Sequence, residues 1–138
     1  MKWAALIAWV ITAGGGFILL SIWVMRGGLR QRGEGLRIRP TLILTHFGLA
    51  AAGLVLWIVY LADSKKTLAW IAFALLLVVA VLGFTMLAIW LQQRKGQTGT
   101  ASRPAEQHFP VPIVGLHGLL AATTLVLVFL TAIGVGES

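Results

Sequence analysis

The chain has 138 residues, of which 59% are hydrophobic and only 11% are charged, and its mean hydropathy is +0.93. This composition excludes an ordinary soluble domain and indicates a membrane protein. The net charge is +7, and no cysteine occurs, which excludes disulfides, iron–sulfur clusters, thiolate metal sites and thiol nucleophiles.

Four apolar runs are long enough to cross a hydrocarbon core of about 30 Å as helices. They cover residues 3–25, 41–62, 68–91 and 112–135. The first run is much longer than the apolar region of a secretory signal, so we expect it to be retained as a span. Little chain remains outside these runs. The sequence therefore predicts one all-α integral membrane domain over residues 1–138, built as a four-helix bundle.

Basic residues gather in the first and third connecting segments, residues 26–40 and 92–111, which hold eight of the eleven lysines and arginines. The positive-inside rule places both segments in the cytoplasm and both termini outside, as expected in a bacterial plasma membrane. This clustering favours anionic lipid over nucleic acid as the partner of the arginines. Trp3 and Trp70 near the outer face, and Trp23 and Trp90 near the inner one, are expected to be interface anchors.

The spans resemble one another in pairs. GFILLSIWVMR, from residue 16, matches GFTMLAIWLQQR, from residue 83, and HFGLAAAGLVLWIVY, from residue 46, matches HGLLAATTLVLVFLT, from residue 117. We therefore expect a duplicated two-helix hairpin, with repeats at about residues 1–62 and 68–135. Because each repeat holds an even number of spans, the two halves would be parallel and related by an axis along the membrane normal.

His46 and His117 occupy equivalent positions in the second and fourth spans. Each lies six or seven residues from the cytoplasmic end of its span, which places both imidazoles at a depth of about 10 Å. In an up-down-up-down bundle these spans lie on a diagonal about 12 to 14 Å long. That separation suits an imidazole, a metal and an imidazole in line, although either histidine alone could simply bond to a neighbouring helix.

Small residues accompany both histidines. Four- and seven-residue spacing places Ala50 and Gly53 on the face of His46, and Ala121 and Thr124 on the face of His117. Gly16 and Gly83 lie at a similar depth in the other two spans. These residues could leave room for a flat macrocycle, or could simply allow close helix packing in lipid.

All four acidic residues lie in loops or at the C-terminus, so a carboxylate-ligated zinc site or a buried carboxylate proton relay has no candidate inside a span. Haem iron needs only two axial protein ligands because the porphyrin supplies the other four, and histidine is a common one. Arg37 and Arg39, just before the second span, are candidate partners of haem propionates.

With these residues, the chain resembles the small four-helix membrane cytochromes of b type, in which histidines on two helices hold a haem. The resemblance covers the four spans and implies that His46 and His117 are the axial ligands of a haem b in an electron-transfer protein or respiratory-chain subunit. It also implies a quinone as a candidate partner. Family members that carry electrons across the bilayer generally hold two haems, whereas His108, the only further histidine, lies in the third loop. Either another membrane subunit or redox partner would then supply the next centre, or electron transfer would be confined to the cytoplasmic half of the bilayer.

Two other classes stay open. One is a non-catalytic accessory subunit of a larger respiratory or transport complex, in which the histidines only form hydrogen bonds between helices. The other is a small carrier of a solute or of protons, which is disfavoured because few polar groups lie inside the spans. The composition of residues 96–107 predicts a flexible linker, and His108 is expected to be a solvated loop residue or a lid over the bundle end. The sequence identifies no catalytic residue, so whether the protein is an enzyme stays open.

Overall fold

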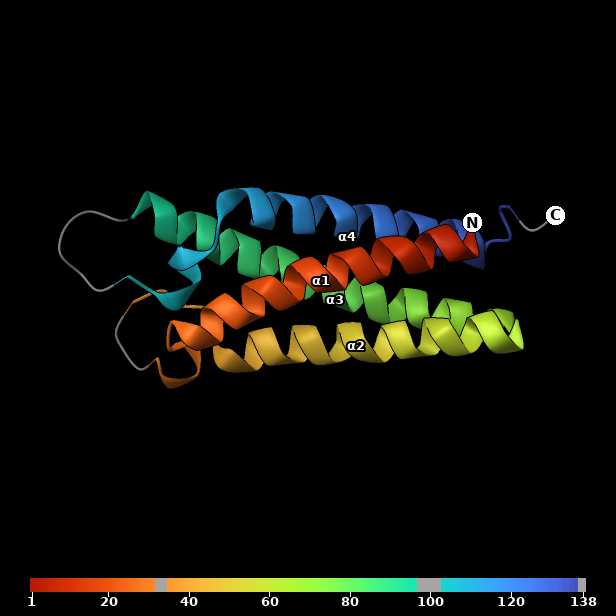
Figure 1. Cartoon of the computed structure of the whole chain (residues 1–138), viewed down its shortest axis with the longest axis horizontal. Helices are drawn as coiled ribbons and strands as arrows, with labels where there is room; N and C mark the ends of the chain where they lie inside the picture. The colour runs from red at the N-terminus through yellow and green to blue at the C-terminus, as the bar shows by residue number, and fades with distance from the viewer. Residues whose placement is uncertain (32–34, 97–102, 137–138) are drawn as a thin grey trace.

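The computed structural model of the chain describes residues 1–31, 35–96 and 103–136, and these form an antiparallel bundle of four long helices (Figure 1). The helices are α1 (Lys2–Met25), α2 (Pro40–Asp63), α3 (Lys66–Lys95) and α4 (Val111–Ala132). Two short 3₁₀ turns, η1 (Gly28–Arg30) and η2 (Ala105–His108), lie in the loops. No strand occurs among the described residues, so the all-α prediction is confirmed.

Each of the four helices is long and apolar enough to cross a membrane. The predicted spans agree with them to within a few residues. The largest differences are at α3, which continues to Lys95, and at α4, which ends at Ala132. The fold is therefore that of an integral membrane protein in contact with the lipid bilayer, and its outer surface carries exposed side chains such as Phe17 and Phe84.

Local sequence explains where the helices begin and turn. Pro40 stands at the start of α2 and Pro112 in the first turn of α4, where a missing N–H costs nothing. The turn from α2 to α3 needs only Ser64, with a φ of 55°, and Lys65. A connection this short forces α2 and α3 to run antiparallel side by side.

Helix α2 packs mainly against α3, and α1 mainly against α4, with further contacts between α3 and α4 and between α1 and α2. Helices α2 and α4 therefore lie on a diagonal of the bundle, as expected. Both termini lie at the same end as the α2–α3 turn, which we call the terminal end, and η1 and η2 lie at the opposite, loop end (Figure 1).

Two clusters of buried side chains fill the bundle. The cluster at the terminal end centres on Trp9, Trp57 and Tyr60, whose indole and phenol rings stack with centroids 4.8 to 6.3 Å apart. The cluster at the loop end contains Trp23, Trp90, Ile38, Ile43 and Ala105. Trp23 and Trp90 are thus buried in protein, which contradicts their predicted role as interface anchors. Trp3 and Trp70 are exposed, as that role requires.

Candidate functional site

The histidines of α2 and α4 lie close together in the half of the bundle nearer the loop end. His46 on α2 and His117 on α4 have ring centroids 6.4 Å apart, and their ring planes are inclined at 66°. Both side chains are half-buried. The structure therefore brings together the two residues that the sequence analysis paired.

Each imidazole is held by a backbone carbonyl of the adjacent helix. Nδ1 of His46 lies 3.0 Å from the carbonyl oxygen of Val79 on α3, and Nδ1 of His117 lies 2.9 Å from that of Thr12 on α1. Because a carbonyl oxygen only accepts, Nδ1 must carry the proton and donate it. In a neutral ring Nε2 then keeps its lone pair, and neither Nε2 has a hydrogen-bond partner among the described residues.

A glycine makes room for each ring. A Cβ atom on Gly83 would lie 3.2 Å from Cε1 of His46, and one on Gly16 would lie 2.9 Å from Cε1 of His117. Each glycine stands four residues, or one helical turn, after the residue whose carbonyl accepts the histidine bond. The carbonyl and the glycine of one turn thus fix each imidazole from a neighbouring helix.

The other small residues predicted for the site contact protein. Gly53 packs against the indole of Trp9, where an added Cβ would lie 3.0 Å from the ring. Thr124 is buried, with its hydroxyl oxygen 3.2 Å from that of Thr12 and bonded to the carbonyl of Leu120. Ala50 packs against the terminal-end cluster, and Ala121 is half-buried. Their role in lining a cofactor stays a prediction.

The arginines predicted as partners of propionates lie at the loop end. Arg39 is the exposed N-cap of α2. Arg37 is half-buried, and its Nε has no partner among the described residues. Arg94 on α3 lies over the ring of Trp90, with its guanidinium carbon 4.9 Å from the ring centroid.

The sequence analysis missed a buried polar network at the loop end, which we call the Glu106 network. Oε1 of Glu106 accepts hydrogen bonds from the backbone N–H of Ile38 at 2.9 Å and from Nε2 of Gln93 at 2.7 Å. Gln107 donates to Oε1 of Gln93 at 2.7 Å, and the indole of Trp90 donates to the carbonyl of Glu106 at 3.0 Å. Residues 104–107 were predicted to be part of a flexible linker; instead, they cover the bundle end and bury the Glu106 side chain completely.

Three polar atoms in and beside this network are buried without a partner among the described residues. They are Oε2 of Glu106, Oε1 of Gln107 and Nε1 of Trp23. Unpaired buried polar atoms are costly and uncommon in folded proteins. The sequence did carry one signal, since Gln92 and Gln93 follow the apolar run of the third span directly, at the positions where the matching first span has Met25 and Arg26.

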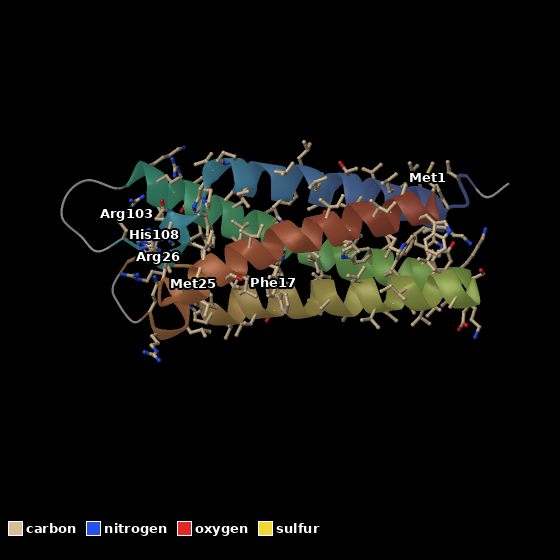
Figure 2. All side chains as sticks on the ribbon, in the orientation of Figure 1. Met1, Phe17, Met25, Arg26, Arg103 and His108 are labelled. Carbon is tan, nitrogen blue, oxygen red and sulfur yellow. The ribbon has the colours of Figure 1, made fainter. Side chains whose placement is uncertain are left out.

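His108 lies at the surface of the loop end, where Figure 2 shows it together with Arg26 and Arg103. Burial lowers the pKa of His108 below its usual 6.5, and the positive charges of Arg26 and Arg103 lower it further. The structure puts His108 in η2, nine residues before His117, as a partly covered loop residue outside the spans.

The described residues contain no group of three or more His, Cys, Asp or Glu side chains that could hold a metal ion alone. The chain matches no protein-family model, no curated protein and no solved structure. The chemistry of the site therefore has to be argued from its own geometry.

The separation of the two rings can be compared with that of two imidazoles on one metal ion. A ring nitrogen lies about 1.1 Å from the imidazole centre and binds a metal at about 2.0 Å, so two coaxial rings on one ion have centroids about 6.2 Å apart. The centroids of His46 and His117 are 6.4 Å apart, with the ring planes inclined at 66°. Because Nδ1 of each ring is bonded to a carbonyl oxygen, Nε2 is the nitrogen that each ring has left for a further partner.

Proposed function

We propose that this chain is a membrane-embedded, b-type cytochrome-like electron-transfer protein that holds one haem b between α2 and α4, with His46 and His117 as the axial ligands. The observation that carries the proposal is the pair of imidazoles 6.4 Å apart, each with Nδ1 bonded to a backbone carbonyl and Nε2 free. A bound haem supplies one-electron redox chemistry.

The protein's own residues would set the properties of the ligands. The carbonyl oxygens of Val79 and Thr12 fix the ring orientation and the tautomer, and a hydrogen bond from Nδ1–H makes Nε2 a more basic ligand. The surrounding apolar helices exclude water. Arg37 and Arg39, at the loop end, are the cations we propose for the propionates.

The same contacts support the proposed duplication of a two-helix hairpin. In the aligned repeats His46 corresponds to His117, Gly83 to Gly16 and Val79 to Thr12. Each histidine makes the same bond to a carbonyl and the same contact with a glycine. Two axial ligands of one haem would need two histidines in equivalent surroundings on opposite helices, and these contacts supply them.

One haem in the half of the bundle nearer the loop end cannot pass electrons across the whole bilayer. We propose that another membrane subunit or redox protein supplies the next centre, with a quinone as a candidate partner. The arginine-rich loop end would face the cytoplasm of a bacterial plasma membrane, and both termini would lie outside.

A second candidate is a non-catalytic accessory subunit of a larger membrane complex. One observation favours it: the bonds from His46 to Val79 and from His117 to Thr12 would join α2 to α3 and α4 to α1 without any cofactor. This alternative gives both histidines a role, but it leaves Nε2 of each ring without one.

The absorption spectrum of the purified protein separates the two functions. From haem-replete cells we expect a red protein with a sharp Soret band and an alpha band on reduction. His46→Ala and His117→Ala should each abolish or severely weaken these bands, while His108→Ala, outside the pair, should keep them. A colourless wild-type protein, or intact spectra in both variants, would contradict the haem proposal and favour the accessory subunit.

A further inference from the structure

The Glu106 network holds a buried carboxyl group that the proposed electron-transfer function does not use. The Glu106 side chain is 0% exposed. Its Oε1 takes two hydrogen bonds, from the N–H of Ile38 and from Gln93, whereas Oε2 has no partner among the described residues. Oε2 is therefore the atom to which a proton can be added without breaking a hydrogen bond.

We propose that Glu106 is a proton-binding site coupled to the redox state of the histidine centre, so that the carboxylate takes up one proton from the cytoplasmic side when the centre accepts one electron. This inference rests on the proposed function. A bound haem would supply the one-electron change, with the electron coming from a one-electron donor. As the centre accepts that electron, Oε2 of Glu106 would form an O–H bond with a proton given up by a hydronium ion of the solvent, which leaves water. The two events together leave the total charge of the buried region unchanged.

The distance between the two groups permits this coupling. Gly83 contacts His46, and Gln93, ten residues later on α3, donates to Glu106. A rise of about 1.5 Å per residue puts the carboxyl about 15 Å from the histidine level. At an effective dielectric constant of about 20, a unit charge at that distance changes proton binding roughly sevenfold.

Apart from Glu106 itself, the charged side chains that the structure describes at the loop end are all basic. Arg26 follows α1, Arg37 precedes Ile38, Arg94 lies over Trp90, and Arg103 and His108 flank the carboxyl on its own segment. None of them forms an ion pair with Glu106 within the part of the chain that is described. Glu106 is therefore the only acidic side chain that the structure describes at the loop end.

Electron and proton binding are reciprocal, so the coupling is measured as a pH-dependent midpoint potential. In spectroelectrochemical titrations between about pH 4 and pH 9, the midpoint potential of the wild-type protein should fall by a total of about 50 mV, the equivalent of a sevenfold change. In a His108→Ala background, which removes the histidine that titrates in the same turn, Glu106→Gln should remove the fall while keeping an oxygen acceptor at this position. In the same background Asp63→Asn, which changes an exposed acid at the terminal end, should keep it.

A midpoint potential of the wild-type protein that does not change with pH would overturn the inference, as would an undiminished fall in Glu106→Gln. If Glu106→Gln does not bind haem, a Glu34→Gln/Glu137→Gln background leaves Glu106 as the single glutamate. With isotope-labelled glutamate, a label-sensitive protonated-carboxyl band should then appear in the reduced-minus-oxidised infrared spectrum, and its absence would refute the proposal. Protein without haem contradicts the proposed function itself, whereas haem with a pH-independent potential contradicts only this inference.

Discussion

Nδ1 of His117 lies 2.9 Å from the carbonyl oxygen of Thr12, and one helical turn beyond Thr12 the backbone of Gly16 faces Cε1 of the same ring. His46 has the same relationship to Val79 and Gly83. The position of each ring is thus determined by a neighbouring helix as well as by its own, which leads to a direct test.

Replacing the glycines should displace the rings. In Gly16→Ala the new methyl group would lie 2.9 Å from Cε1 of His117, too close for any real contact, and in Gly83→Ala it would lie 3.2 Å from Cε1 of His46. Overpacking of this kind costs about 1–3 kcal/mol, so we expect lower thermal stability and weaker haem retention, with the larger effect at Gly16. Thermal unfolding followed by circular dichroism and by the Soret band measures both.

Gly14→Ala is the matched control for the glycine variants. It lies on the same helix, and an added Cβ meets nothing within 4 Å. It should unfold at or above the wild-type temperature. If Gly14→Ala and Gly16→Ala lowered the unfolding temperature equally, then helix α1 would tolerate no side chain in this region. The contact with His117 would not be the cause of the loss.

Removing the Glu106 side chain should destabilise the loop end. Glu106→Ala leaves the backbone N–H of Ile38 and one N–H of Gln93 without their acceptor in a buried region. We expect a loss of about 1–3 kcal/mol in the free energy of unfolding. Glu106→Gln should lose less because an amide oxygen can still accept. Chemical unfolding in detergent micelles measures the difference, and similar losses in the two variants would be evidence against these hydrogen bonds as the cause.

The pKa of His108 offers a test of the charge arrangement at the loop end. Since burial and the charges of Arg26 and Arg103 lower this pKa below 6.5, Arg26→Gln and Arg103→Gln should each raise it. Protonation of His108 is disfavoured in the folded protein. The stability that the neutral His108 side chain contributes is therefore fully present above pH 6.5, the usual pKa of a free histidine, and is lost as the pH falls from there through the lower pKa of the folded protein.

Titration of isotope-labelled histidine by NMR follows His108 directly. Lys65→Gln, at the terminal end and paired with Asp63, should leave the pKa unchanged. A pKa of His108 that stays at its wild-type value in both arginine variants would show that those charges do not act on the ring.

The proposed orientation in the membrane can be tested with single cysteines because the native chain has none. Gln92 at the loop end and Thr67 at the terminal end are both exposed. A membrane-impermeant maleimide added to intact cells should label Thr67→Cys and spare Gln92→Cys until the cells are broken. The reverse pattern would place the arginine-rich end outside.

Much of the fold follows from sequence because it depends on local properties. The length and hydropathy of each run predict the spans, and the two-residue turn at Ser64 leaves α2 and α3 no other arrangement. The pairing of His46 with His117 was predicted from the similarity of the spans, since equivalent residues of two parallel halves would lie at one depth.

The Glu106 network was not predictable in the same way. Its formation depends on how residues 104–107 return onto the bundle and on which backbone groups of the first loop they meet, and neither is encoded in a local pattern. The burial of Trp23 follows from the same packing, because its ring lies against Gly28 and the cluster around Ile38. For Gly53 the partner is Trp9, a residue of another helix that no spacing rule connects to it.

The bond between His117 and Thr12 joins residues 105 positions apart in the chain. During biosynthesis the first three helices can enter the bilayer while His117 is still being made, so only half of the pair can be in place until the last helix emerges. Insertion of α4 beside α1 is thus the step that completes the centre. Truncated or stalled chains would consequently leave His46 alone in the bilayer, unable to form the two-sided site.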